Sequence, residues 1–221
     1  MKLLHIDSSI SGDESASRQI SAAVVDRLKR ENPSLEITYR DVAAAPVPHH
    51  TEALQNLKMA AAAQSGALNT GAVKVAGGEV TGETADAQHD LDAINEVLEE
   101  FLAADIVVVG APMYNLGIPS QLKAWADALA APGRTFRYTE AGAEGLCGAK
   151  RIIVASSRGG IYSMPPMDGF EHQEKFLISW FGFLGVNNTE FVRAEGVNYG
   201  PEQRKVALDA ALAEASTLKA A

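Results

Sequence analysis

The chain has 221 residues, of which 47% are hydrophobic and 21% charged, a composition typical of soluble globular proteins. Its 19 basic residues against 28 acidic residues give a formal net charge of −9, which argues against nonspecific binding to nucleic acid or to anionic membranes. Cys147 is the single cysteine, which excludes an internal disulfide and a multi-cysteine metal site.

The first half of the chain alternates between short apolar runs and helical patterns. These patterns predict strands at 2–7 and 35–40 and helices at 17–30, 52–64 and 87–103. Glycines interrupt the helical pattern after Gln64, and we expect a loop or insertion over 58–86. The apolar part of 2–7 is too short for a signal peptide, and no apolar run approaches the roughly 20 residues that span a bilayer. We therefore expect a cytoplasmic protein.

The second half continues the alternation of strands and helices. It predicts strands at 105–110, 151–156 and 188–193 and helices at 120–129, 170–184 and 201–218. The run at 105–110 is almost continuously apolar, as expected of a central parallel strand covered on both faces. The sequence TFRY and the glycine-rich stretch after it predict a small hairpin or flap over 133–149. Together the elements predict one α/β domain, 1–221, with a doubly wound five-stranded parallel sheet and helices on both faces.

A polar loop follows the first predicted strand. In an open parallel sheet, ligands bind beyond the carboxyl ends of the strands, so the loops at those ends are candidate binding segments. Segment 8–18 is rich in serine and runs directly into a helix. Hydroxyl groups and the free N–H groups of a helix start can hold a phosphate. Capping of the helix by Ser15 or Ser17 explains the same residues equally well.

Two further loops follow central strands. Met113, Tyr114 and Asn115 could flank a planar heterocycle, although composition alone favours a turn whose tyrosine and methionine complete the core. Gly159-Gly160 would let the backbone approach a flat ligand closely, with Ser157 and Arg158 as donors, and a tight turn is the competing interpretation. Three such loops at three strand ends predict a flat cofactor that carries a phosphate.

Several other site types lack their motifs in this sequence. The dinucleotide pattern G-x-G-x-x-G and the Walker A pattern are absent, so neither a Rossmann NAD site nor an NTPase is indicated. Ser156 and Ser157 suggest a hydrolase, but no G-x-S-x-G elbow is present. The five histidines are scattered without ligand spacing, so we expect no metal site.

Several short segments, taken in order, resemble one known family. They are S-S-I, A-P-M-Y-N, P-S-Q-L-K, T-F-R-Y-T-E, S-R-G-G and A-E-G-V-N-Y-G-P-E. They cover nearly the whole chain and resemble the FMN-dependent NADH azoreductases, whose fold is flavodoxin-like. The resemblance implies that Ser9, Ser15, Ala16 and Ser17 hold the FMN phosphate, that Met113, Tyr114, Asn115 and Leu116 cradle the ring and ribityl chain, and that Ser157, Arg158, Gly159 and Gly160 close the pyrimidine side.

The same resemblance implies an activity and an assembly. It implies a ping-pong transfer of two electrons from NADH or NADPH, through FMN, to quinones and to azo compounds whose azo bond is cleaved, on a homodimer. No acid–base side chain is assigned, because the flavin carries the chemistry. Backbone N–H groups of Asn115, Gly159 and Gly160 are expected to stabilise charge on the ring. Tyr162, Met164 and Met167 are expected to line the substrate cavity.

Two departures from the family and one alternative function remain. Leu116 stands where the family often has an aromatic residue, and the stretch 60–86 differs from the family pattern. The alternative is a flavodoxin-type electron carrier, which would not oxidise NAD(P)H itself. The predicted flap and the apolar helix at 170–184 argue against a carrier, because they suit a lid and a dimer interface.

Overall fold

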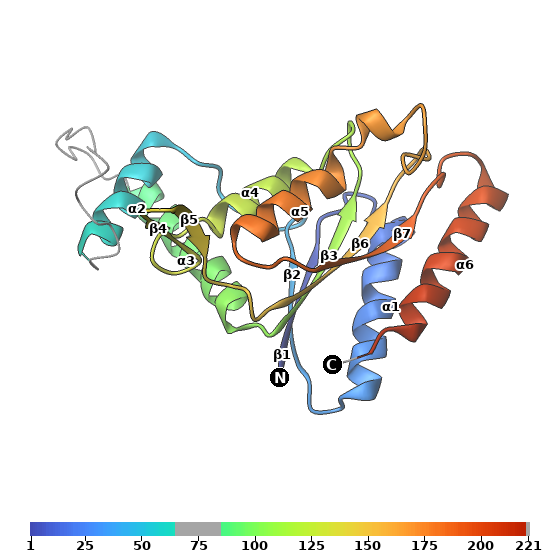
Figure 1. Cartoon of the computed structure of the whole chain (residues 1–221), viewed down its shortest axis with the longest axis horizontal. Coiled ribbons are helices and arrows are strands. Elements are labelled where there is room, and N and C mark those ends of the chain that lie inside the picture. The colour runs from blue at the N-terminus through green and yellow to red at the C-terminus, as the bar shows by residue number, and fades with distance from the viewer. Residues whose placement is uncertain (65–84, 220–221) are drawn as a thin grey trace.

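One parallel sheet organises the computed structural model, which describes residues 1–64 and 85–219 (Figure 1). Its strands are β1 (Lys2–Asp7), β2 (Glu36–Asp41), β3 (Ile106–Pro112), β6 (Arg151–Ser157) and β7 (Thr189–Ala194). They lie in the order β2-β1-β3-β6-β7, and every neighbouring pair is parallel. The strand order reverses between β1 and β3. This confirms the predicted doubly wound, five-stranded sheet.

Helices cover both faces of the sheet, as the alternation predicted. Helices α1 (Ala16–Glu31) and α6 (Pro201–Thr217) lie on one face, and α3 (Ala85–Ala103), α4 (Ser120–Ala128) and α5 (Gln173–Phe183) lie on the other (Figure 1). Helix α2 (Glu52–Gln64) packs against α3. Successive side chains of a strand point to opposite faces, so Leu3 packs under α1 while Leu4 enters the other layer.

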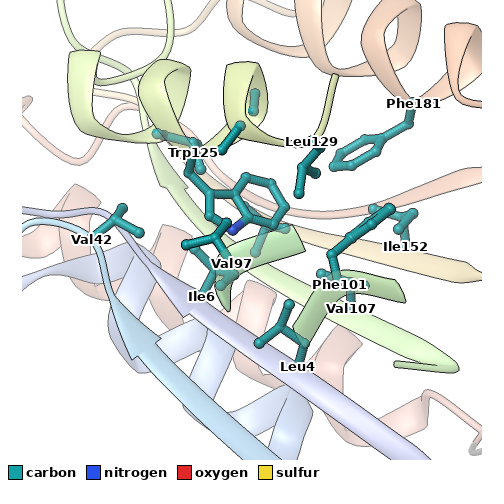
Figure 2. Packing of buried hydrophobic residues seen from close by; sticks show 14 of the residues in the cluster. Leu4, Ile6, Val42, Val97, Phe101, Val107, Trp125, Leu129, Ile152 and Phe181 are labelled. Atoms are coloured by element: carbon teal, nitrogen blue, oxygen red, sulfur yellow. The ribbon is translucent and has the colours of Figure 1, made fainter. Parts of the chain in front are cut away.

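The larger hydrophobic layer lies beneath α3, α4 and α5 (Figure 2). Trp125 from α4 is fully buried there and meets Phe101 edge-on, with ring centroids 6.2 Å apart. Phe181 from α5 is also fully buried in this layer. Trp180 and Phe183 are only partly covered. The large aromatics of α4 and α5 therefore range from the core to the surface.

Most predicted bounds agree with the structure within two residues, and the exceptions have local causes. Helix α5 begins at Gln173 rather than at 170, because Asp168–Phe170 forms a separate 3-10 turn. The Glu171 carboxylate accepts the N–H groups of Glu174 (2.7 Å) and Lys175 (3.3 Å), which stabilises the first turn at its observed start.

Two other predicted segments, the loop 58–86 and the hairpin or flap at 133–149, contain regular structure. In the predicted loop 58–86, residues 58–64 belong to α2 and 85–86 begin α3, while 65–84 lie outside the described residues. The predicted flap contains an antiparallel hairpin of β4 (Phe136–Thr139) and β5 (Gly142–Gly145). Gly145 contacts the backbone of Gly185 so closely that a Cβ atom would lie 2.1 Å from its nitrogen. The hairpin therefore packs closely against the turn after α5.

Candidate functional site

The loops that follow β1, β3 and β6 meet at the carboxyl edge of the sheet. They enclose a cavity of about 220 Å³. The predicted residues that line it are Ser9, Ser15, Ala16, Met113, Tyr114, Ser157 and Gly159. Sequence reasoning did not predict three other lining residues, Val197, Asn198 and Arg204, which come from the loop after β7 and from α6. The structure thus brings the three predicted loops together and adds a fourth segment.

A second, larger cavity of about 670 Å³ shares Tyr114 with the first. Asn115 and Ile118 line it from the loop after β3, and His172 and Phe176 line it from the start of α5. Its wall exposes more apolar than polar surface, which suits a flat organic molecule. Tyr114 therefore lines both the small polar cavity and the larger apolar one, whereas Asn115 lines only the larger.

The start of α1 supplies donors to the smaller cavity. The Ser15 side chain accepts the N–H of Arg18 at 3.3 Å and is the N-cap, and it shares a hydrogen bond of 3.0 Å with the Ser17 hydroxyl. The N–H groups of Ala16 and Ser17 lie in the first helical turn, where no carbonyl of the helix can accept them. The helix dipole favours an anion at this position. Ser15 thus caps α1, as predicted, and also lines the small cavity. Capping and ligand binding are therefore compatible roles for this residue.

Replacing Ser15 by alanine is expected to lower the free energy of unfolding by about 1 kcal/mol, because the cap of α1 is lost. Urea unfolding of the flavin-free protein measures this change. Ser11→Ala is the matched control, since Ser11 occupies the N-cap position of a short 3-10 turn and makes no side-chain capping bond. Equal losses in both variants would contradict a specific capping role for Ser15.

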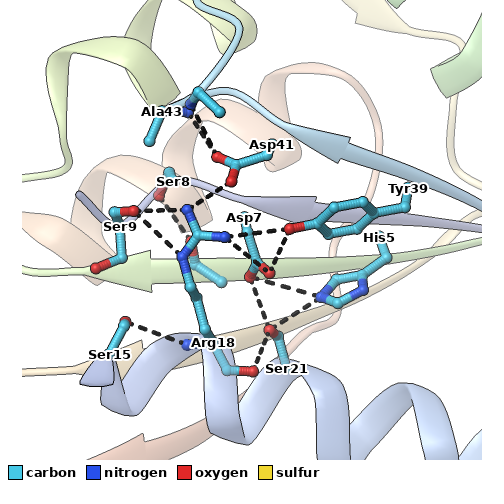
Figure 3. Close-up of polar contacts among 12 residues, drawn as sticks. His5, Asp7, Ser8, Ser9, Ser15, Arg18, Ser21, Tyr39, Asp41 and Ala43 are labelled. Carbon is cyan, nitrogen blue, oxygen red and sulfur yellow. Dashed lines mark hydrogen bonds and ion pairs between the residues drawn. The ribbon is translucent and has the colours of Figure 1, made fainter. Parts of the chain in front are cut away.

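A buried polar cluster supports the first loop from below (Figure 3). The Arg18 guanidinium donates to the Ser9 carbonyl from Nε (3.2 Å) and Nη2 (2.7 Å). Nη2 also pairs with Asp41 at 2.7 Å, and Nη1 lies 3.7 Å from Asp7. Burial alone would lower the pKa of Arg18, but the nearby Asp41 and Asp7 carboxylates outweigh it and raise the pKa. Arg18 thus fixes the backbone at Ser9.

The Asp7 carboxylate is the centre of this cluster. Its oxygens accept the hydroxyls of Ser21 (2.8 Å) and Tyr39 (3.2 Å), and His5 Nε2 lies 2.9 Å from the Ser21 oxygen. A Cβ atom at Gly110 on β3 would lie 2.3 Å from Asp7 Oδ1. Because the neighbouring strand offers no side chain there, the carboxylate has room to stand between β1 and α1.

The loop after β3 is a tight turn with two unusual residues. The N–H of Tyr114 donates to the Gly117 carbonyl (3.0 Å), and the N–H of Gly117 donates to the Tyr114 carbonyl (3.1 Å). Between them, Asn115 and Leu116 have φ angles of 49° and 73°, the left-handed values of a type I′ turn. The Tyr114 hydroxyl accepts the N–H of Ile10 at 3.1 Å. This turn is therefore tied to the first loop.

The loop after β6 is joined to the loop after β7 by its carbonyl groups. The Gly159 carbonyl accepts the N–H of Asn198 (3.1 Å), and the Gly160 carbonyl accepts the N–H of Gly196 (3.0 Å). Within the described part of the chain, the N–H groups of Asn115, Gly159 and Gly160 have no partner. These are the three donors that we expected to stabilise charge on a bound ring.

The Arg158 side chain points away from the cavity, contrary to its expected use as a donor to the ligand. It is 2% exposed, donates from Nε to Gln173 (3.1 Å) and pairs with Glu195 at 2.9 Å. It also pairs with Glu174 and lies 3.5 Å from Glu171. These carboxylates hold the guanidinium inside the protein. A contact with the ligand is therefore predicted only for the backbone of Arg158.

The residues expected at the substrate cavity lie beyond the Gly159-Gly160 loop. The Tyr162 N–H donates to Glu195 at 2.9 Å, and its ring lies beside Gly160. Met164 is largely exposed and Met167 half-buried. None of the three lines either of the two cavities. Their role in binding a substrate stays a prediction.

A family described by its flavodoxin-like fold matches residues 1–218. The chain belongs to this flavodoxin-like family. The strand order β2-β1-β3-β6-β7, with its reversal between β1 and β3, is the order of a flavodoxin-like sheet.

Relatives within the flavodoxin-like family are similar over their full length. An FMN-dependent NADH:quinone oxidoreductase of Rhizobium meliloti (strain 1021) is 50% identical, and the alignment covers 100% of both chains. An FMN-dependent NADH:quinone oxidoreductase 2 of Bradyrhizobium diazoefficiens is 49% identical with the same coverage. The crystal structure of an azoreductase from Bacillus anthracis str. Sterne superposes with a TM-score of 0.82 at 28% identity, covering 98% of this chain and 97% of that chain.

Proposed function

We propose that the chain is an FMN-dependent oxidoreductase that transfers two electrons from NADH or NADPH to quinones and azo compounds. The observation that carries the proposal is the small cavity, where a serine-rich helix start, an aromatic turn and a glycine backbone converge. This combination fits a flat ring with a phosphate tail. Full-length similarity to FMN-dependent NADH:quinone oxidoreductases supports the same assignment.

The residues present fit FMN at both of its ends. Ser9, Ser15, Ala16 and Ser17 would hold the phosphate, because hydroxyls and free N–H groups at a helix start bind anions. Met113, Tyr114, Asn115 and Leu116 would cradle the ring and ribityl chain, and Ser157, the backbone of Arg158, Gly159 and Gly160 would close the pyrimidine side. Of these residues, Met113, Tyr114, Ser157 and Gly159 line the small cavity. When bound, FMN supplies the two-electron redox chemistry.

The protein's own contribution is orientation and electrostatic stabilisation. The N–H groups of Asn115, Gly159 and Gly160, which have no partner in the described part of the chain, would donate to the ring edge and stabilise negative charge there. The Tyr114 hydroxyl, held by the Ile10 N–H, fixes the wall between the two cavities. The larger apolar cavity would take the donor and the acceptor in turn, as a ping-pong reaction requires.

The proposal extends to a cytoplasmic homodimer. Phe176, Trp180 and Phe183 form an aromatic row along α5, with successive ring centroids 6.5 and 5.6 Å apart. On the same helix, Ile178 is 51% exposed and Phe183 37% exposed. Apolar side chains concentrated on one helix favour an interface with a second copy. Of the helices in the described part of the chain, none has the length and apolar character that a membrane crossing needs.

An anaerobic titration with NADH tests this function. The protein, loaded with FMN, should lose its flavin absorption on adding NADH and regain it on adding a quinone. A parallel titration with NADPH would establish which donor is preferred. Retained flavin that NADH cannot reduce would indicate the electron-carrier alternative instead. Failure to retain any flavin would contradict the assignment of all three loops.

A further inference from the structure

Three guanidinium groups lie at or near the small cavity, and their hydrogen bonds differ. Arg18 lies beneath the first loop, where its N–H groups donate to the Ser9 carbonyl and the Tyr39 hydroxyl and pair with carboxylates. Arg158 is buried among Gln173 and its partner carboxylates. Only Arg204, among the described residues that line this cavity, brings a positive charge to its wall.

Arg204 is held at the cavity by a single anchoring bond. It lies in the first turns of α6, and its Nη2 donates to the Glu14 carbonyl of the 3-10 turn that precedes α1. A guanidinium has five N–H donors. No other partner of this side chain exists among the residues that the structure describes. Its remaining donors are therefore available to a ligand in the cavity that Ser9 and Ser15 also line.

The protein around Arg204 is negatively charged, so an anionic ligand needs a positively charged group in this cavity. The chain carries a formal net charge of −9, and the carboxylate-bearing residue Glu14 lines the same cavity. Backbone donors and the helix dipole supply only partial positive charges. A phosphate group with nearly two negative charges would gain from a full positive charge at hydrogen-bonding distance, because charge-assisted hydrogen bonds are about twice as strong as neutral ones.

We propose that Arg204 binds the phosphate group of FMN from the α6 side, and so makes the protein select the phosphorylated flavin over riboflavin. The proposal rests on the FMN-binding function stated above. It assigns to the last helix a direct contact with the cofactor, in addition to the serines of the first loop. The anchoring bond to Glu14 sets the position of the guanidinium before the cofactor arrives.

Flavin binding by the full-length chain, stripped of its cofactor, tests this role. Quenching of flavin fluorescence gives the Kd of FMN and of riboflavin for wild type and Arg204→Gln. We expect the FMN Kd to rise by about tenfold or more in the variant, the loss of one charge-assisted bond. The riboflavin Kd should stay within about twofold, because riboflavin has no phosphate to lose.

Two further variants keep the result interpretable. Lys205→Gln removes the neighbouring positive charge, which pairs with Asp209 on the outer side of α6, and should leave both Kd values unchanged. Arg204→Lys keeps the charge and should recover part of the FMN affinity. If Arg204→Gln weakens both flavins equally, the residue only supports the turn at Glu14 and the proposal fails. An unchanged FMN Kd also overturns it, whereas wild-type protein that binds neither flavin would refute the proposed function itself.

Discussion

Replacing Arg158 by methionine is expected to lower the free energy of unfolding by about 3–5 kcal/mol, because it removes the buried guanidinium that neutralises two carboxylates. Arg158 is 2% exposed and contacts Glu174 and Glu195 at once. Chemical unfolding followed by circular dichroism measures the loss. Arg137→Met is the matched control, since Arg137 pairs with Glu144 on the exposed hairpin, where solvent screens the ion pair and its contribution to stability is small. Equal losses in the two variants would contradict the importance of burial.

The same variant should change how stability depends on pH. Burial alone would raise the pKa of Glu195, but hydrogen bonds from Ser163, the Tyr162 N–H and Arg158 outweigh it and hold the pKa below its ordinary value. A carboxyl with a lowered pKa in the folded state stabilises the protein at neutral pH, and this contribution is lost as pH falls through that pKa. The difference in stability between wild type and Arg158→Met should therefore shrink as pH falls from about 7 to about 3. A difference that grows on acidification would contradict this assignment.

Gly159→Val should yield a folded protein that retains no flavin after purification. A Cβ atom at Gly159 would lie 2.5 Å from the side-chain nitrogen of Asn198, and both residues line the small cavity. The valine must displace either Asn198 or its own backbone, whose N–H is a proposed donor to the ring. Flavin absorbance per mole of purified protein measures the effect, and circular dichroism checks the fold.

A double variant separates the clash from other effects of the substitution. Gly159→Ala adds only the Cβ atom and is expected to weaken FMN binding in the wild-type background. In an Asn198→Ala background the side chain that it meets is gone, so the same substitution should have a much smaller effect. If the loss of affinity is the same in both backgrounds, Asn198 is not the obstacle, and Gly159 acts through the backbone.

The sheet and the three loops could be predicted because both leave strong local signals. Apolar runs and helical periodicity identified the strands and helices, and polar or glycine residues at the carboxyl ends of three strands identified the loops. The predicted start of α5 lies too early because Phe170 extends the apolar pattern. The observed start is marked instead by the Glu171 side chain, which accepts the N–H groups three and four residues later. Periodicity does not report such bonds.

The missed residues depend on contacts between distant segments. Asn198 and Val197 follow an edge strand, and they reach the cavity through backbone bonds to Arg158 and Gly159 that no side-chain pattern reveals. The cluster around Asp7 requires the pairing of β1 with β2, which sets His5 beside Tyr39 and Asp7 beside Asp41. Once that register is known, the alternating polar residues of the two strands predict the cluster. The sequence alone leaves the register undetermined.

The bond between Arg204 and the Glu14 carbonyl joins segments from opposite ends of the chain. During synthesis, the serine-rich loop leaves the ribosome long before the helix that completes the cavity wall. A nascent chain that ends before α6 therefore has an unfinished cofactor site, however well its first strands have folded. Cofactor capture then follows translation of α6, and products that terminate before this helix would accumulate without flavin.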